Sequence, residues 1–190
     1  MLRTLLIGGL LSFAVLPVWG RQLDFNINSD TAQVGVQGAL SLTEFGRSGF
    51  NVSVLFADRK PEDNVLFEAG LAVAGEAGTD APGLEFGVGL SVLGGQVGSA
   101  DVGALELGGG VRYAPPSYSR FFVAVGIGYA PQIVTFNDAD EVLRTLVRLG
   151  YELLPEAQIY LGYREWQFEL TDGTEVQGDK GGHFGVTFRF

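Results

Sequence analysis

The stretch FFVAVGIGYA, residues 121–130, decides the fold. Its first, third, fifth, seventh and ninth residues are large and apolar, and most of the residues between them are alanine or glycine. An alternation with a period of two is typical of a β-strand with one apolar face, because successive side chains point to opposite sides. The stretch therefore predicts a strand of about ten residues, which is long enough to cross a membrane when tilted.

The same alternation recurs along most of the chain. It occupies residues 23–27, 34–42, 50–56, 65–73, 84–92, 105–113, 121–129, 143–151, 159–163 and 184–190. Clusters rich in Gly, Pro, Asp and Asn separate most of these segments and predict turns. The succession predicts an all-β, antiparallel up-and-down barrel with ten strands. The alternative is eight strands, with residues 23–27 outside the barrel and another pair merged.

One segment fits two structures. In DADEVLRTLVRLGYELL, residues 138–154, Val142, Leu146, Leu149 and Leu153 share one helical face, and Asp140 is a suitable cap. A helix there would leave nine strands, and an odd number cannot close antiparallel with both chain ends on one side. We therefore predict a strand.

The faces opposite the apolar ones indicate what the barrel is surrounded by. They are crowded with Gly, Ala and Ser, as in Gly87, Gly89 and Ser91, which suits a narrow lumen better than a surface in water. The large apolar residues therefore face outward, as contact with lipid requires. A soluble barrel with an apolar interior is the alternative. We predict a transmembrane barrel, because a closed barrel satisfies its backbone groups within hydrocarbon.

The N-terminal residues and the composition limit the location and the chemistry. Residues 1–20 have the basic start, apolar stretch and small closing residue of a secretory signal peptide, which leaves residues 21–190 as the barrel. The net charge of −10 argues against a nucleic-acid partner. The sequence contains no cysteine and one histidine, His183, so thiol chemistry and most metal sites are excluded.

The last strand, GGHFGVTFRF, resembles the signal by which bacterial barrel-assembly machinery recognises outer-membrane proteins, with Phe184, Phe188 and Phe190 as its aromatic positions. The whole chain further resembles the YfaZ family of small outer-membrane proteins. The resemblance rests on length, segment order and three stretches: GGGVRY at 108–113, LGYRE at 161–165 and GVTFRF at 185–190. It implies a barrel in the bacterial outer membrane and brings no catalytic residues.

Charged residues on the inner face are expected to pair, because a buried charge needs a partner. The residues assigned to this ion-pair network are Glu68, Glu106, Arg112, Arg144, Arg148 and Arg164. We expect the network to fill and stiffen the lumen of a monomeric barrel that has a structural or envelope role. A narrow, porin-like channel for small solutes is the alternative.

Enzymatic activity is not expected. His183 is the residue to consider for an outer-membrane hydrolase, since it begins the last predicted strand near Asp172, Asp179 and Glu175. No serine in a suitable pattern accompanies it. A histidine at the rim is expected to be solvated. The acidic loop residues are expected to keep the loops hydrated rather than to bind a cation. The sequence thus predicts no catalytic site, no metal and no cofactor.

Overall fold

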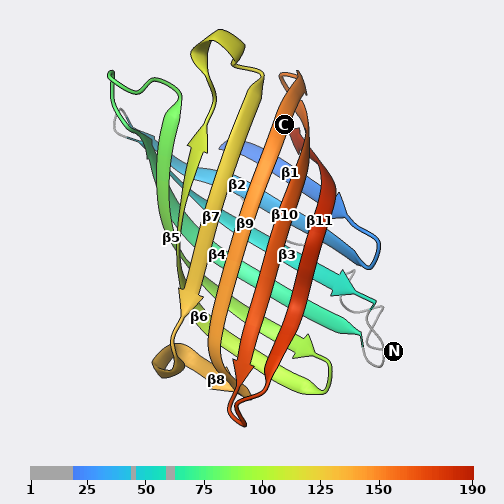
Figure 1. The fold of residues 1–190 in the computed structure, drawn as a ribbon. Coiled ribbons are helices and arrows are strands. Elements are labelled where there is room, and N and C mark those ends of the chain that lie inside the picture. Colours follow the sequence, from blue (N-terminus) through green and yellow to red (C-terminus); the bar gives the residue numbers. More distant parts are fainter. Residues whose placement is uncertain (1–18, 44–45, 59–62) are drawn as a thin grey trace.

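Almost all described residues of the protein lie in β-strands (Figure 1). A computed structural model describes residues 19–43, 46–58 and 63–190. The strands are β1 Trp19–Ile27, β2 Thr31–Thr43, β3 Gly46–Ala57, β4 Asn64–Glu76, β5 Leu84–Val97, β6 Ala100–Tyr113, β7 Phe121–Ala130, β8 Thr135–Asn137, β9 Ala139–Leu154, β10 Ala157–Leu170 and β11 Glu175–Arg189. Two short 3-10 helices, η2 Pro116–Tyr118 and η3 Gln132–Val134, lie between strands. No helix in the described ranges is long and apolar enough to cross a membrane.

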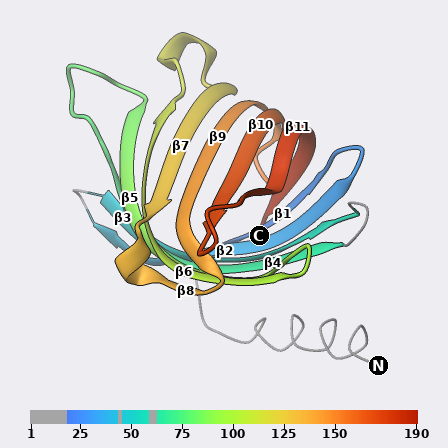
Figure 2. The ribbon, with the colours of Figure 1, turned by 60° about the horizontal axis from the view of Figure 1, so that its bottom comes forward.

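The strands form one antiparallel sheet that closes on itself. Apart from β8, neighbours in sequence are neighbours in the wall, and β1 pairs with β11. β7 pairs with β9, and β8 pairs with β6. At the closing seam the backbones of Arg21 and Phe190 exchange two hydrogen bonds, with N···O distances of 3.0 and 2.9 Å. Figure 2 shows the curved wall around the lumen. The predicted antiparallel up-and-down barrel is confirmed.

Ten strands make up the wall, and β8 is a prolongation of β7. Both pair with β6: Leu107 lies opposite Tyr129 of β7, and Ala104 lies opposite Thr135 of β8. The step from Leu107 to Ala104 is three residues along β6, whereas the matching step from Tyr129 to Thr135 is six residues. η3 accommodates the three extra residues between β7 and β8. Since β1 belongs to the wall, the prediction of ten strands is confirmed and the alternative of eight is wrong.

The ambiguous segment at 138–154 is a strand rather than a helix. β9 pairs with β10 along nearly its whole length, from Ala139 to Leu154, and with β7 on its other side. These two ladders satisfy its backbone groups, so tertiary pairing decides between the two local structures.

The predicted signal peptide, residues 1–20, lies outside the described residues except at its last two positions. Trp19 and Gly20 begin β1.

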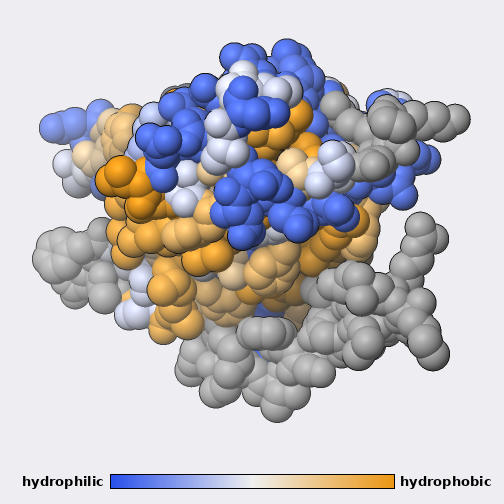
Figure 3. All heavy atoms as spheres, turned by 90° about the horizontal axis from the view of Figure 1, so that it is seen from below, coloured by the Kyte–Doolittle hydropathy of each residue, from blue (hydrophilic) through white to orange (hydrophobic). Residues whose placement is uncertain are grey.

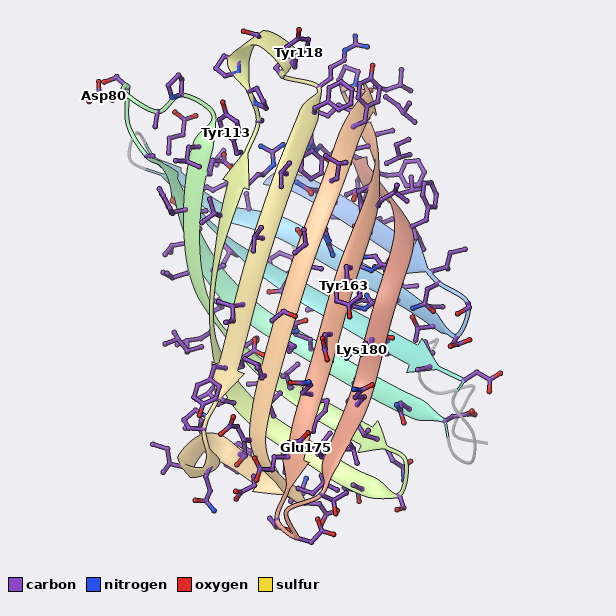
Figure 4. All side chains as sticks on the ribbon, in the orientation of Figure 1. Asp80, Tyr113, Tyr118, Tyr163, Glu175 and Lys180 are labelled. Carbon is purple, nitrogen blue, oxygen red and sulfur yellow. The ribbon has the colours of Figure 1, made fainter. Side chains whose placement is uncertain are left out.

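The barrel has two ends, the near end and the far end. The near end holds Trp19 and Phe190, together with the connections β2–β3, β4–β5, β6–β7 and β9–β10. The far end holds the connections β1–β2, β3–β4, β5–β6, β8–β9 and β10–β11. Figure 4 shows Asp80 and Tyr118 in near-end connections and Glu175 at the far end, with Tyr163 and Lys180 between them.

The outer surface carries a band of exposed apolar side chains around the barrel. Leu71, Leu90, Leu107, Ile127 and Leu161 are between 54% and 64% exposed. Figure 3 shows part of this band beside a hydrophilic region. On β10 and β11 the band gives way to polar residues, where Lys180 Nζ lies 2.7 Å from Glu165 Oε1 and Gln167 donates to the same oxygen. On these two strands the outer face thus changes from apolar to charged before the far end.

Inside the wall, several large side chains lie flat over a glycine of the neighbouring strand. Gly185 lies opposite Tyr160 and Gly150 lies opposite Phe122. A Cβ atom at either glycine would overlap the aromatic ring beside it. Glycine is needed at these positions because it lets the ring approach the backbone.

Candidate functional site

A cluster of buried apolar side chains lies inside the barrel at the far end. The residues of this far-end cluster are Leu55, Ala57, Leu66, Leu93, Val97, Val102, Ala104, Ala130, Ala139, Val142, Trp166 and Phe168, and each is at most 4% exposed. They come from inward positions at the far ends of β3, β4, β5, β6, β7, β9 and β10. Burial of apolar surface stabilises this packing, as in the core of a soluble protein.

A hydrogen-bonded bridge crosses the lumen beside the far-end cluster. The side chain of Asn64 on β4 donates to the backbone carbonyl of Gly178 on β11 at 3.0 Å and accepts from the backbone N–H of Gly98 at 2.8 Å. A Cβ at Gly178 would lie 2.9 Å from a methyl carbon of Leu66. Because β4 and β11 are not neighbours in the wall, these contacts hold opposite sides of the barrel together.

A second layer consists of one arginine shared between two glutamates. Arg144 Nη1 donates to Glu68 Oε2 at 2.7 Å, and Nη2 pairs with Glu106. Asn51 donates to Glu68 at 3.0 Å, and the Arg144 guanidinium lies 4.8 Å from the centre of the Trp166 ring. The charged layer therefore packs directly against the far-end cluster.

A second buried ion pair lies on the other side of the lumen. Arg164 on β10 pairs with Asp179 on β11, and both side chains are almost completely buried. The same guanidinium donates to Asn26 Oδ1 at 2.8 Å, to Gln33 and to Thr31. These neutral acceptors satisfy the remaining donors of a charge that would otherwise be costly to bury.

The near end carries ion pairs that are open to solvent. Arg47 and Glu85 form a two-pronged pair with distances of 2.8 and 2.9 Å, and Arg112 lies 3.9 Å from Glu85. Arg189 donates to Glu152 at 2.8 Å. Exposed pairs of this kind contribute little to stability, and the buried apolar cluster of the described residues lies at the far end instead.

Between the two ends the barrel surrounds a partly open cavity of about 530 Å³. Its lining includes inward glycines and alanines of β4 to β7 and polar side chains of β2 and β3. Residues Gln22 and Arg47 extend the lining toward the near end, whereas Glu106, Arg144 and Trp166 line it on the far side. The cavity is therefore bounded by the charged layer and the far-end cluster.

The structure divides the six residues that were expected to form one ion-pair network. It brings Glu68, Glu106 and Arg144 together. Arg164 pairs with Asp179, and Arg112 lies near Glu85 at the near end. Arg148 forms no salt bridge with any described residue, and its guanidinium lies 4.6 Å from the centre of the Tyr160 ring. The sequence pattern places a residue on the inner face but does not say which residue it meets across the lumen.

The expectation for His183 is wrong. β11 begins at Glu175, so His183 lies well inside the strand, is 4% exposed, and contacts the Tyr160 ring edge-on at a centroid distance of 5.8 Å. It is a buried lumenal residue rather than a solvated rim residue. Phe184, Phe188 and Phe190 point outward and are 43–66% exposed. In the part of the chain that the structure describes, no group of three or more potential ligands is placed to hold a metal ion.

Sequence reasoning missed the far-end cluster, although a signal for it exists. The inner face of β3 reads Asn51, Ser53, Leu55, Ala57, so it changes from polar to apolar toward the far end. Leu66 and Leu93 are the corresponding apolar residues on the inner faces of β4 and β5. Segments in which both faces are apolar have no period-two signal, so the alternation ends where the cluster begins.

Comparisons with known proteins find similarity in structure only. Neither a protein-family model nor a curated protein matches the chain. A solved chain from a study of the in-meso crystallization of membrane proteins aligns over 90% of this chain and 82% of its own, with 11% identity and a TM-score of 0.47. The outer membrane channel DcaP of Acinetobacter baumannii aligns with 10% identity and a TM-score of 0.45 over 89% of this chain.

The alignment covers 62% of DcaP, so this chain spans less than two thirds of its length. The KdgM porin aligns over 90% of this chain and 99% of its own, with 10% identity and a TM-score of 0.43. Identities this low transfer no residue role from these proteins to this one.

Proposed function

We propose that this protein is a small β-barrel of the bacterial outer membrane that has a structural or envelope role and does not conduct solutes. The observation that carries the proposal is the far-end cluster, whose buried apolar side chains pack together inside the barrel at one end. The Asn64 bridge and the shared Arg144 support it, because they connect strands across the same part of the lumen. The outward apolar band and the closed backbone ladder support the location in lipid.

The remaining parts of the proposal come from the sequence. The resemblance to the YfaZ family, the secretory signal at residues 1–20 and the C-terminal strand support export and insertion by the barrel-assembly machinery. We propose that the barrel is a monomer in outer-membrane lipid and has no enzymatic activity. The burial of His183 supports the latter, since a hydrolytic histidine at the rim must reach its substrate.

Conductance in a planar bilayer tests the closed lumen. Full-length protein purified from membranes is expected to give no steady openings. The double substitution Leu66→Ala with Phe168→Ala removes two large, fully buried side chains of the far-end cluster, one from β4 and one from β10, and we expect it to produce openings. The control is Leu161→Ala with Phe184→Ala, which removes similar volume from the outward face and should leave the bilayer silent. Steady openings from the unaltered protein would contradict the proposal.

A narrow channel is the second candidate, and the cavity of about 530 Å³ favours it. In that case a path must pass the layer of Glu68, Glu106 and Arg144. Openings of the unaltered protein whose ion selectivity changes with Glu106→Gln would identify that path. Openings that are insensitive to this substitution would point to leakage around the protein.

A further inference from the structure

The cavity has the size and the lining of a site for a small molecule. Its volume of about 530 Å³ lies within the range of about 300–1,000 Å³ that is typical of ligand pockets. Leu146, Ala72 and several glycines give it apolar surface, and Gln37, Asn51 and Ser53 give it polar groups. The proposed structural role does not use this space, because that role rests on the far-end cluster alone.

Arg148 stands out among the charged residues that line the cavity. Its Nε atom is buried without a hydrogen-bond partner, and no described carboxylate forms a salt bridge with its guanidinium. Its neighbours in register are Ala124 on β7 and Gly162 on β10, so neither residue directly opposite Arg148 has a long side chain. The Tyr160 ring supports the guanidinium from one face. The Nη groups of Arg148 donate to no described residue and remain available to a ligand, whereas Nε is buried.

The other charges around the cavity already have partners. Asp24 accepts hydrogen bonds of 2.7 Å from both Tyr160 and Thr187, and a third from Asn26. Glu68 and Glu106 share Arg144, and Arg47 pairs with Glu85. Binding an anion at Arg148 therefore requires no existing ion pair to break.

We propose that Arg148 binds the carboxylate of a small organic acid in the lumenal cavity. A guanidinium offers parallel N–H donors that match the two oxygens of a carboxylate, and the bond is stronger where water is excluded. The alanines, glycines and Leu146 contact the hydrocarbon part of the acid. A single guanidinium suits a single negative charge better than a phosphate. The acid enters from the near end, since the far-end cluster fills the other side.

Saturation-transfer NMR on the full-length protein in deuterated detergent tests this site, with butyrate as the probe. We expect a saturable signal for butyrate and none for butyramide, which has the same shape without the charge. Arg148→Gln should weaken butyrate binding by about tenfold or more, because the positive charge and the parallel N–H donors of the guanidinium are both lost. The matched control is Arg120→Gln, which removes an exposed arginine from the β6–β7 connection and should leave binding unchanged.

A second variant keeps the test decisive if Arg148→Gln does not fold. A Cβ at Gly126 would make only ordinary contacts, the nearest at 3.8 Å, so Gly126→Leu is expected to fold and to occupy the cavity while leaving Arg148 intact. It should abolish the butyrate signal. Equal binding by either variant and the unaltered protein would overturn the proposal. Equal binding of butyramide, or stronger binding of inorganic phosphate, would overturn the assignment to a carboxylate. None of these results affects the conductance test.

Discussion

At Arg144 one guanidinium neutralises two carboxylates from different strands, Glu68 of β4 and Glu106 of β6. Replacing Arg144 with methionine keeps most of the volume but leaves both glutamates without their cation. Loss of one partner from a buried pair costs about 3–5 kcal/mol, and we expect a reduction of this size in the free energy of unfolding. Urea-induced unfolding of the protein in detergent measures it. Arg120→Met, an exposed site, should change it by less than about 0.5 kcal/mol.

Gly185 offers a second test at the level of one residue. A Cβ there would overlap the Tyr160 ring, so Gly185→Ala must displace Tyr160 from its place between Asp24 and Arg148. Overpacking of this kind costs about 1–3 kcal/mol, which the same unfolding experiment detects. The control is Gly87→Ala, because a Cβ at Gly87 meets nothing closer than 3.5 Å. Equal effects of the two substitutions would contradict the close approach of Tyr160 to β11.

The sequence predicts which residues face the lumen but not which of them pair across it, and the reason is physical. The period-two pattern correctly places Glu68 and Arg144 on the inner face, because that depends only on the alternation of neighbouring side chains. Pairing across the lumen depends on the stagger of the strands, which no local pattern contains. For that reason the meeting of Arg164 with Asp179, and the lack of a carboxylate partner for Arg148 among the described residues, became visible only in the structure.

At the level of the element, the outward face of β10 changes from apolar to polar along the strand. Leu161 is 63% exposed in the apolar band, whereas Gln167, farther along the strand, belongs to the polar part beside Glu165 and Lys180. An arginine at the middle of a bilayer costs about 2–4 kcal/mol and much less near the interface. We therefore expect Leu161→Arg to destabilise the barrel by about this amount and Gln167→Arg to be tolerated. Unfolding of both variants in liposomes measures the difference.

The closing strand gives a second prediction at this level. The backbone of Phe190 completes the seam with Arg21, and its side chain is the last aromatic of the proposed assembly signal. Deleting Phe190 should lower the amount of protein in the outer membrane, measured by quantitative immunoblotting of membrane fractions. Phe190→Ala keeps the seam bonds and removes only the aromatic ring. A normal level of the alanine variant would argue against recognition of the ring, and a normal level of the deletion would argue against both roles.

The elements themselves were largely predictable. Segments such as β5 and β7 alternate cleanly because one face is apolar and the other is made of small residues. The interruption between β7 and β8 was not predicted. Pro131 cannot donate to the ladder with β6, and the chain turns through η3 before it resumes pairing at Thr135. A proline marks such a site, but the place where pairing resumes depends on the partner strand.

For the whole molecule, closure predicts resistance to detergent. A barrel with no open sheet edge unfolds only when many ladder bonds break together, so unheated protein should stay folded in sodium dodecyl sulfate and migrate differently from boiled protein on a gel. Leu161→Ala should preserve the shift, since it leaves the ladders intact. A band that does not respond to heating, from protein that is soluble without detergent, would contradict a transmembrane barrel.

The far-end cluster also gives the molecule two halves of different stability. Toward the far end a cluster of buried apolar side chains packs inside the wall, whereas toward the near end the strands surround a cavity lined by glycine. Local opening is easiest where packing is sparse, so the near half should fluctuate more and its amide protons should exchange with solvent sooner. A small molecule would then enter through the half of the barrel that opens locally most often. An acid bound in the cavity would make those local openings less frequent.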